Sequence, residues 1–196
     1  MTEAPTVLVT YASAQGSTAT IAERIRDTLA AAGCSAASAP VTDDPDPGGF
    51  AAIVLGSAIH DGDYLPEFYR YLERHHADLS ARPTWLFSVG MGPALRGPIG
   101  AVFRRMVPPS IASVRDTLGV NEFHAFAGAF DRPPQRRLRV IIRLMGARYG
   151  DNRDWGDVTA WAYSIAAHLH RSSGGARGAA PPRGHTPPTP PPGNSA

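Results

Sequence analysis

Short, mostly apolar runs alternate with longer amphipathic stretches along most of this chain. Each run is rich in Val, Ile, Leu, Phe or Ala, which is typical of a parallel strand whose two faces are both covered by helices. The runs occupy residues 6–11, 50–56, 84–89 and 122–130, and a weaker one is expected over residues 34–41. The pattern therefore predicts a sheet of buried strands.

The stretches that follow the runs carry the spacing of helices. Residues 17–32 repeat apolar side chains at every fourth position and end before Gly33, which suits a helix C-cap. The same spacing predicts helices over residues 65–79 and from Asp154 through Leu169. Strands that alternate with helices indicate right-handed βαβ units. We expect a doubly wound α/β sandwich, with a five-stranded parallel sheet in the order 2-1-3-4-5 and helices on both faces.

The chain of 196 residues is long enough for one domain with a full hydrophobic core, which we place over residues 1–170. From residue 171 onward it consists almost entirely of Ser, Gly, Ala, Pro and Arg. Such a segment cannot bury enough apolar surface to offset the entropy lost on ordering. Residues 171–196 are therefore predicted to form a disordered tail.

Charge is distributed unevenly along the chain. Residues 1–93 carry eleven acidic side chains and five Arg, whereas residues 94–148 carry ten Arg and three acidic side chains. Residues 96–106 and 136–148 combine this basic charge with apolar positions at helical spacing. Such helices can lie on an anionic membrane surface or hold an acidic ligand, but an ordinary amphipathic surface helix has the same pattern. Nucleic acid is not expected, because no helix-turn-helix, zinc or aromatic stacking motif accompanies the Arg residues.

The cysteine content and the lack of a long apolar run favour a cytoplasmic location. The single cysteine, Cys34, allows no disulfide within one chain. No basic or histidine neighbour is placed to activate it, so an unreactive core thiol is expected. No apolar run approaches the roughly 20 residues that a membrane-spanning helix needs, and residues 1–5 lack the features of a secretion signal.

A short hydroxyl-rich loop separates the first predicted strand from its helix. A phosphate in this loop would meet the unpaired N–H groups and the positive dipole end of the helix, with hydroxyl groups as further donors. The other interpretation is an ordinary strand-to-helix turn with a Ser or Thr N-cap. The loop residues are Ser13, Ala14, Gln15, Gly16, Ser17 and Thr18.

Two common nucleotide-binding motifs are missing from the sequence. No G-x-G-x-x-G follows the first strand, which argues against a Rossmann NAD site, and no G-x-x-x-x-G-K-[ST] occurs anywhere, which argues against a P-loop NTPase. A monophosphate site remains.

Two further glycine-containing turns are predicted at the carboxyl edge of the sheet, where ligands of doubly wound folds bind. Their main-chain amides can reach the polar edge of a flat ring, whose faces Ile59, Met91 or Tyr64 would cover. His60 is the candidate catalytic residue, as a donor or proton relay, although a solvent-facing loop histidine fits equally well. The first turn contributes Ser57, Ala58, Ile59, His60, Asp61 and Gly62, and the second contributes Ser88, Val89, Gly90, Met91 and Gly92.

No metal site is expected. The adjacent residues His75 and His76 lie one position apart on a predicted helix and cannot share a face.

In order and spacing, four segments together resemble bacterial flavodoxin-domain proteins of the menaquinone-dependent protoporphyrinogen oxidase type. They are Y-A-S-A-Q-G-S-T at residues 11–18, G-S-A-I-H-D-G at 56–62, F-A-G-A at 126–129 and G-D-N-R-D-W at 150–155. The resemblance covers about residues 6–170. It implies a flavodoxin-like fold, with FMN held at its phosphate by residues 13 and 15–18 and around its ring by residues 57–62 and 88–92. In the better-studied members, electron pairs pass from a porphyrinogen to a membrane quinone.

The resulting hypothesis is an FMN-dependent oxidoreductase that transfers electrons in pairs from a small-molecule substrate, such as a porphyrinogen, to a quinone. Residues 136–148 would then make peripheral contact with the inner face of the membrane. Two alternatives stay open. One is a flavodoxin-like electron carrier, which an acidic face around the flavin would favour. The other is a flavin-free module that keeps the fold for binding or regulation.

Overall fold

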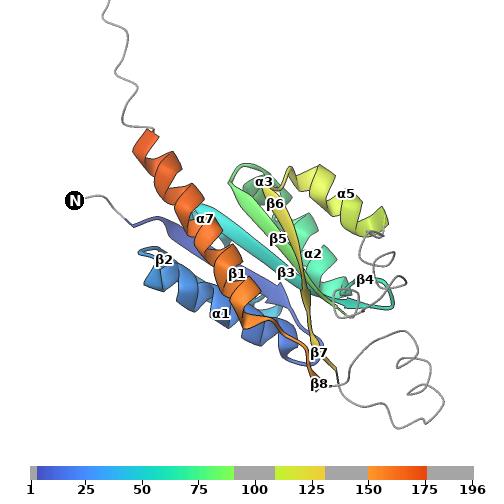
Figure 1. Ribbon diagram of the computed structural model, residues 1–196. Coiled ribbons are helices and arrows are strands. Elements are labelled where there is room, and N and C mark those ends of the chain that lie inside the picture. Colours follow the sequence, from blue (N-terminus) through green and yellow to red (C-terminus); the bar gives the residue numbers. More distant parts are fainter. Residues whose placement is uncertain (1–3, 91–108, 131–149, 176–196) are drawn as a thin grey trace, which may run out of the picture.

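A computed structural model describes residues 4–90, 109–130 and 150–175, which form a three-layer sandwich (Figure 1). The helices are α1 (Ser17–Ala31), α2 (Pro66–Arg74), α3 (His76–Ser80), α5 (Pro109–Leu118) and α7 (Trp155–Gly175). The main strands are β1 (Thr6–Ala12), β2 (Ser35–Pro40), β3 (Ala52–His60), β5 (Thr84–Gly90) and β6 (Glu122–Ala127). Three two-residue strands, β4 (Asp63–Tyr64), β7 (Ala129–Phe130) and β8 (Gly150–Asp151), complete the set.

The main sheet is parallel, in the order β2-β1-β3-β5-β6. When the main strands alone are counted, this is the predicted order 2-1-3-4-5. Between β2 and β3 the chain makes two 3-10 turns, Val41–Asp43 and Pro47–Gly49. The short strand β4 pairs antiparallel with β3, outside the main order. The prediction of a doubly wound α/β fold is confirmed.

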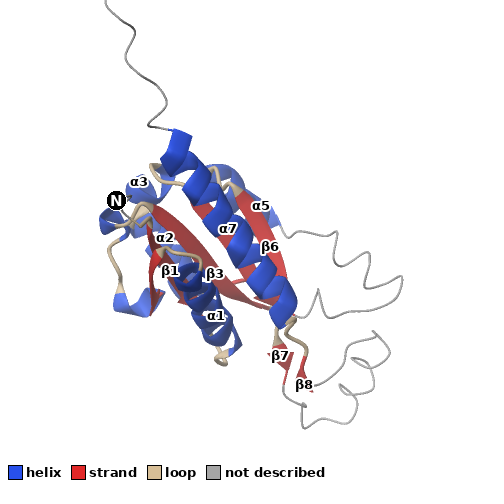
Figure 2. Cartoon of the chain, turned by 60° about the vertical axis from the view of Figure 1, so that its left-hand side comes forward, coloured by secondary structure: helices blue, strands red, loops and turns tan. Residues whose placement is uncertain are grey.

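Helices α1 and α7 cover one face of the sheet (Figure 2). The apolar positions of α1 that recur every four residues are completely buried, as periodicity predicts. Gly33 ends this helix in the left-handed region, with a φ of 89°, as expected of a C-cap. Cys34 is buried beside it, and burial raises the pKa of its thiol, which agrees with the predicted unreactive core position.

Helices α2, α3 and α5 contribute to the core on the opposite face. Phe68, Tyr71 and Leu72 of α2 and Leu79 of α3 are buried against alternate residues of the strands. The predicted single helix over residues 65–79 is wrong in one respect, because His75 interrupts it. The ring of His75 packs on Tyr71, and its backbone leaves the helical region at φ −104° and ψ 17°.

The structure lengthens one predicted helix and adds a helix that was not predicted. Helix α7 continues through Gly175, five residues into the predicted tail, and the remaining tail lies outside the described residues. Helix α5 was not predicted. The two basic helices expected over residues 96–106 and 136–148 also lie outside the described residues. Within the described ranges, no helix combines the length and apolar character needed to cross a bilayer.

The ring of Phe87 in β5 packs closely enough on Gly56 of β3 to exclude any side chain there. A Cβ atom at this position would lie 2.0 Å from Cζ of Phe87, the residue paired with Gly56 in β5. Phe87 is fully buried between Phe126 and Trp161, so its ring has little room to move.

We expect the G56A variant to lose about 3 kcal/mol of unfolding free energy, the upper end of the usual range for overpacking a core. Urea unfolding followed by circular dichroism measures this loss. The matched control is G49A, because a Cβ at Gly49 meets nothing within 4 Å. Equal stability of the two variants would contradict the packing argument.

Candidate functional site

Three segments of the chain meet at the carboxyl edge of the parallel sheet. In-register pairing brings Ala12 at the end of β1 level with Ser57 of β3, and Ser57 level with Ser88 of β5. The loop before α1, the hairpin after β3 and the end of β5 therefore lie together at this edge (Figure 1). This is the convergence that the sequence predicted for a ligand site.

The loop between β1 and α1 turns at Gly16, which has a φ of 84°. The Gly16 amide donates to Oγ of Ser13 at 3.1 Å, which closes the turn. A Cβ on Gly16 would meet nothing within 4 Å, so the loop is open on this side. No side chain caps the first turn of α1, and this leaves its amides available to an anion, as expected for a phosphate loop.

The side chain of Thr18 provides the strongest indication of a bound group. Thr18 is completely buried, yet its Oγ1 has no hydrogen-bond partner among the described residues. A buried hydroxyl without a partner costs free energy, so native structures rarely leave one. The nearby donors are main-chain amides and the hydroxyls of Ser13, Ser17 and Thr18, all neutral and all suited to phosphate oxygens. The loop residues thus fit an FMN phosphate.

The predicted turn over residues 56–62 is largely strand. β3 continues to His60, and Asp61 and Gly62 then reverse the chain with φ values of 51° and 85°. Two consecutive residues at positive φ are typical of the tight hairpin turn that Asp-Gly favours. Ile59 and His60 pair with Tyr64 and Asp63 across this hairpin. The sequence prediction ended the strand too early, because it did not take into account that such a turn allows β3 to continue to His60.

The candidate ring-side residues of β3 and β4 differ in burial. Ser57 is buried, donates its hydroxyl hydrogen to the Ala58 carbonyl at 2.9 Å and accepts from the Leu65 amide, so its hydroxyl has a structural partner. Tyr64 is only 4% exposed and packs on Phe68 within the core, which contradicts the expectation that it covers a flavin face.

Ile59 and Gly90 lie against each other where β3 and β5 end. A Cβ built on Gly90 would be 3.3 Å from Cβ of Ile59, so glycine at this position keeps the two strand ends close. Ser88, Val89 and Gly90 are buried in β5. The remaining predicted residues of this turn, Met91 and Gly92, lie outside the described residues.

His60, the candidate catalytic residue, lies at the exposed tip of the hairpin. Its side chain is 73% exposed, and its Nε2 is 3.7 Å from a carboxylate oxygen of Asp61. The role suggested for His60 stays a prediction. Ile59 lies beside it and is half-buried.

A fourth segment, between β8 and α7, also reaches this edge, and the sequence prediction gave it no role. The guanidinium of Arg153 forms a two-point ion pair with Asp151, with both N···O distances at 2.7 Å. It also donates from Nη1 to Oγ1 of Thr20, in the first turn of α1. The guanidinium groups of Arg153 and Arg24 both lie over the indole of Trp155, at 4.7 Å and 5.3 Å from its centroid. The motif G-D-N-R-D-W in the sequence was the only signal of this arrangement.

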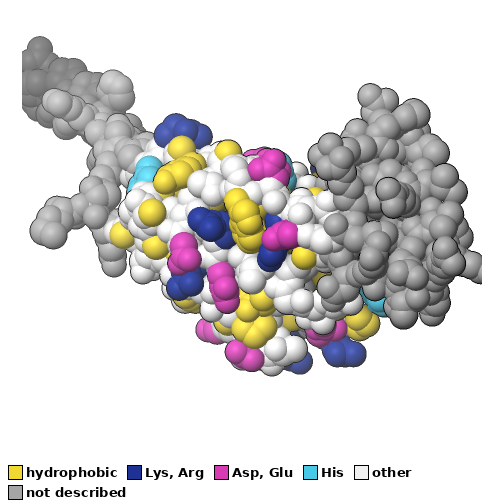
Figure 3. Space-filling model, turned by 60° about the horizontal axis from the view of Figure 1, so that its bottom comes forward, with side chains coloured by type: hydrophobic (Ala, Val, Ile, Leu, Met, Phe, Trp, Pro, Cys, Tyr) yellow, Lys and Arg dark blue, Asp and Glu magenta, His cyan; other side chains and the backbone are white. Residues whose placement is uncertain are grey.

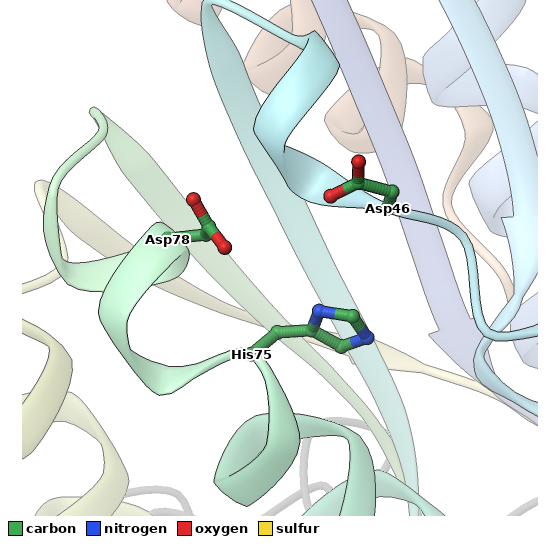
Figure 4. Close-up of side chains that lie close together, drawn as sticks. All are labelled: Asp46, His75 and Asp78. Atoms are coloured by element: carbon green, nitrogen blue, oxygen red, sulfur yellow. The ribbon is translucent and has the colours of Figure 1, made fainter.

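A charged cluster lies at the opposite end of the sheet (Figure 4). Asp46, His75 and Asp78 could each offer a ligand atom to a metal ion, since these atoms lie within 4.8 Å of one another. Both carboxylates already accept hydrogen bonds, Asp46 from the Gly48 amide and Asp78 from Nη1 of Arg82. We therefore interpret the cluster as a polar cross-link between the turn before β3 and helices α2 and α3.

A neighbouring carboxylate extends this cross-link. Nε2 of His75 is 2.9 Å from Asp44, and Nη1 of Arg74 is 2.7 Å from the same carboxylate. The hydrogen bonds of His75 and Arg74, in that order, lower the pKa of the Asp44 carboxyl. The charge of Asp44 is thus balanced by partners from the helix side.

Comparison with protein families identifies residues 8–145 as a flavodoxin domain. Comparison with curated proteins gives no significant match. Flavodoxin domains bind FMN, and the cofactor prediction is therefore confirmed. The match does not distinguish the protoporphyrinogen oxidase type from other flavodoxin domains.

Solved structures show the same fold. A flavodoxin from the domain Archaea has a TM-score of 0.54 at 14% identity, covering 84% of this chain and 99% of that one. Oxidised flavodoxin 1 from Bacillus cereus has a TM-score of 0.52 at 13% identity, with the same two coverages. The rubredoxin oxygen:oxidoreductase of Desulfovibrio gigas has a TM-score of 0.57 at 14% identity, covering 86% of this chain and 37% of that protein. At these identities the likeness establishes the flavodoxin-like fold.

The Asp151–Arg153 ion pair makes a testable contribution to stability. Side-chain hydrogen bonds from Arg153, and then its backbone amide, lower the pKa of the Asp151 carboxyl from 3.8 to about 2. The pair therefore stabilises the fold above about pH 4, and this contribution disappears as the pH falls toward about 2. We expect D151N to be less stable than wild type at pH 6 and the difference to shrink between pH 4 and pH 2. A difference independent of pH in urea unfolding would contradict this assignment.

Proposed function

Because the chain belongs to the flavodoxin-domain family, we propose that it is an FMN-dependent oxidoreductase that transfers electrons in pairs. The unpartnered hydroxyl of Thr18, buried beneath an open Gly16 turn, is the observation that carries this proposal. The isoalloxazine ring of FMN supplies the redox chemistry when bound. The chain itself supplies position and charge.

Separate segments of the chain contribute to this role. The first turn of α1 offers amides and the hydroxyl of Thr18 to the phosphate. The hairpin at Asp61–Gly62 and the end of β5 at Gly90 offer main-chain groups near the ring, and half-buried Ile59 supplies apolar surface. His60, exposed at the hairpin tip, is placed to exchange protons with solvent during flavin reduction.

An acidic substrate such as a porphyrinogen, with a quinone as acceptor, is the specific form of the proposal. Two basic segments, residues 91–108 and 131–149, support it. Gly90 directly precedes the first segment and Gly150 directly follows the second, and both of these described residues lie at the site edge. Both segments are rich in Arg and nearly free of acidic side chains, which suits the carboxylates of such a substrate. Their Arg residues are Arg96, Arg104, Arg105, Arg132, Arg136, Arg137, Arg139, Arg143 and Arg148.

An electron carrier of the flavodoxin type is the second candidate, favoured by the likeness of the whole fold to flavodoxins. A carrier that is steered toward basic partners needs an acidic face. On the face drawn in Figure 3, acidic and basic side chains of the described residues are interspersed. The side chains in this view do not form the acidic face that such a carrier needs.

The T18V variant tests whether the buried hydroxyl contacts the phosphate. Valine keeps the shape of threonine but cannot donate, and a hydrogen bond to a charged group is worth about 1.5–3 kcal/mol. We expect FMN binding to weaken about ten- to a hundredfold, as measured by quenching of flavin fluorescence during titration. The T28V variant is the control, because the Thr28 hydroxyl on the same helix bonds the Arg24 carbonyl instead. Equal FMN affinity of T18V and T28V would contradict the phosphate contact, and a colourless wild-type protein that ignores FMN would support the flavin-free module.

An anaerobic assay separates the oxidoreductase from the carrier. We expect the FMN-loaded protein to oxidise a porphyrinogen with a quinone as acceptor, at a rate that falls with flavin occupancy in T18V. Oxidation must stop when the quinone is omitted. Flavin that is reduced by neither small molecule, but that accepts electrons from a flavodoxin reductase, would identify a carrier.

A further inference from the structure

The phosphate loop contains no charge of its own. Residues 12–20 include neither Lys nor Arg, nor any acidic side chain. A phosphate monoester carries about two negative charges near neutral pH. Loop amides and hydroxyls meet that charge with dipoles alone, so a cation nearby would add substantial attraction.

Arg153 brings a cation to this loop from the other end of the chain. Its Nη1 donates to Oγ1 of Thr20, 133 positions away in sequence. The hydroxyl of Thr20 in turn lies 3.0 Å from the Ser17 carbonyl and 3.3 Å from the Gly16 carbonyl. One side chain therefore separates the guanidinium from two residues of the phosphate loop.

The guanidinium of Arg153 is fixed by its contacts with described residues, and these contacts do not use all of its N–H donors. Its side chain is only 17% exposed, which limits screening by solvent. Asp151 accepts two hydrogen bonds from it, and the ring of Trp155 packs against it. A guanidinium has five N–H donors, and hydrogen bonds to described residues use three of them. Within the described part of the chain, two N–H groups are not used and can meet an anion.

Asp151, the negative partner of Arg153, binds different nitrogens of the guanidinium from the one that contacts α1. Asp151 binds Nε and Nη2, whereas Nη1 is the nitrogen that reaches α1. The ion pair thus presents its positive end to the loop. Arg24 also stacks on Trp155 but lies one helical turn further along α1 than Thr20.

We propose that Arg153 is a specificity-determining residue that makes the site prefer FMN over riboflavin by placing positive charge beside the phosphate. This inference rests on the proposed function, since it requires a flavin in the site. It assigns a role to a segment that would otherwise be a structural connection between β8 and α7.

Titration of the full chain with FMN and with riboflavin tests the proposal, because riboflavin has the same ring but no phosphate. We expect R153M to weaken FMN binding about five- to tenfold at low ionic strength, as for loss of a charge-assisted contact partly offset by Asp151. Riboflavin binding should change less than twofold. The R153K variant should recover part of the FMN affinity, and 0.5 M salt should narrow the gap between R153M and wild type.

R24M is the matched control, because it removes another Arg that lies over the same indole and that has no hydrogen bond to Thr20 among the described contacts. We expect R24M to bind both flavins like wild type. If R153M weakens the binding of FMN and of riboflavin equally, Arg153 has only a structural role. If R153M weakens the binding of neither flavin, the charge does not reach the phosphate. Either result overturns the inference and leaves the proposed function standing. A wild-type protein that binds neither flavin would instead overturn both.

Discussion

Parallel pairing of β1 with its neighbour β3 is the constraint from which the candidate site follows. The pairing is in register from Val7↔Ala52 to Ala12↔Ser57, so both strands reach the same edge at the same level. β5 continues the alignment on the other side of β3. Apolar side chains on both faces hold this register, because a shift by one residue would turn each of them to the wrong helix layer. Loops from distant parts of the sequence thereby form one site.

Features that depend on local periodicity could be predicted from the sequence. The strands, the burial of α1 and the C-cap at Gly33 follow from spacing and residue type, and the turn between β1 and α1 follows from its position. The length of β3 did not follow, because an Asp-Gly pair that reverses a strand in two residues looks like part of a loop. Tyr64 shows the same difficulty, since only the packing of β4 decides whether its ring faces a ligand or the core.

Charge beside the loop could not be predicted, because it depends on contacts between remote segments. Arg153 reaches Thr20 only once α7 has packed beside α1, and no local pattern encodes that approach. The break between α2 and α3 at His75 has a similar origin, because His75 forms a hydrogen bond to Asp44 in the turn before β3. In both cases a polar side chain bonds a partner that the spacing of the residues around it does not reveal.

The contact between Arg153 and Thr20 also bears on the order in which the molecule is completed during synthesis. Thr20 leaves the ribosome before its cationic neighbour Arg153, which follows 133 positions later. A nascent chain that has already paired β1 with β3 and β5 therefore still presents an electrically neutral anion pocket. With the role proposed for Arg153, full discrimination between phosphorylated and unphosphorylated flavin requires α7 to be packed beside α1.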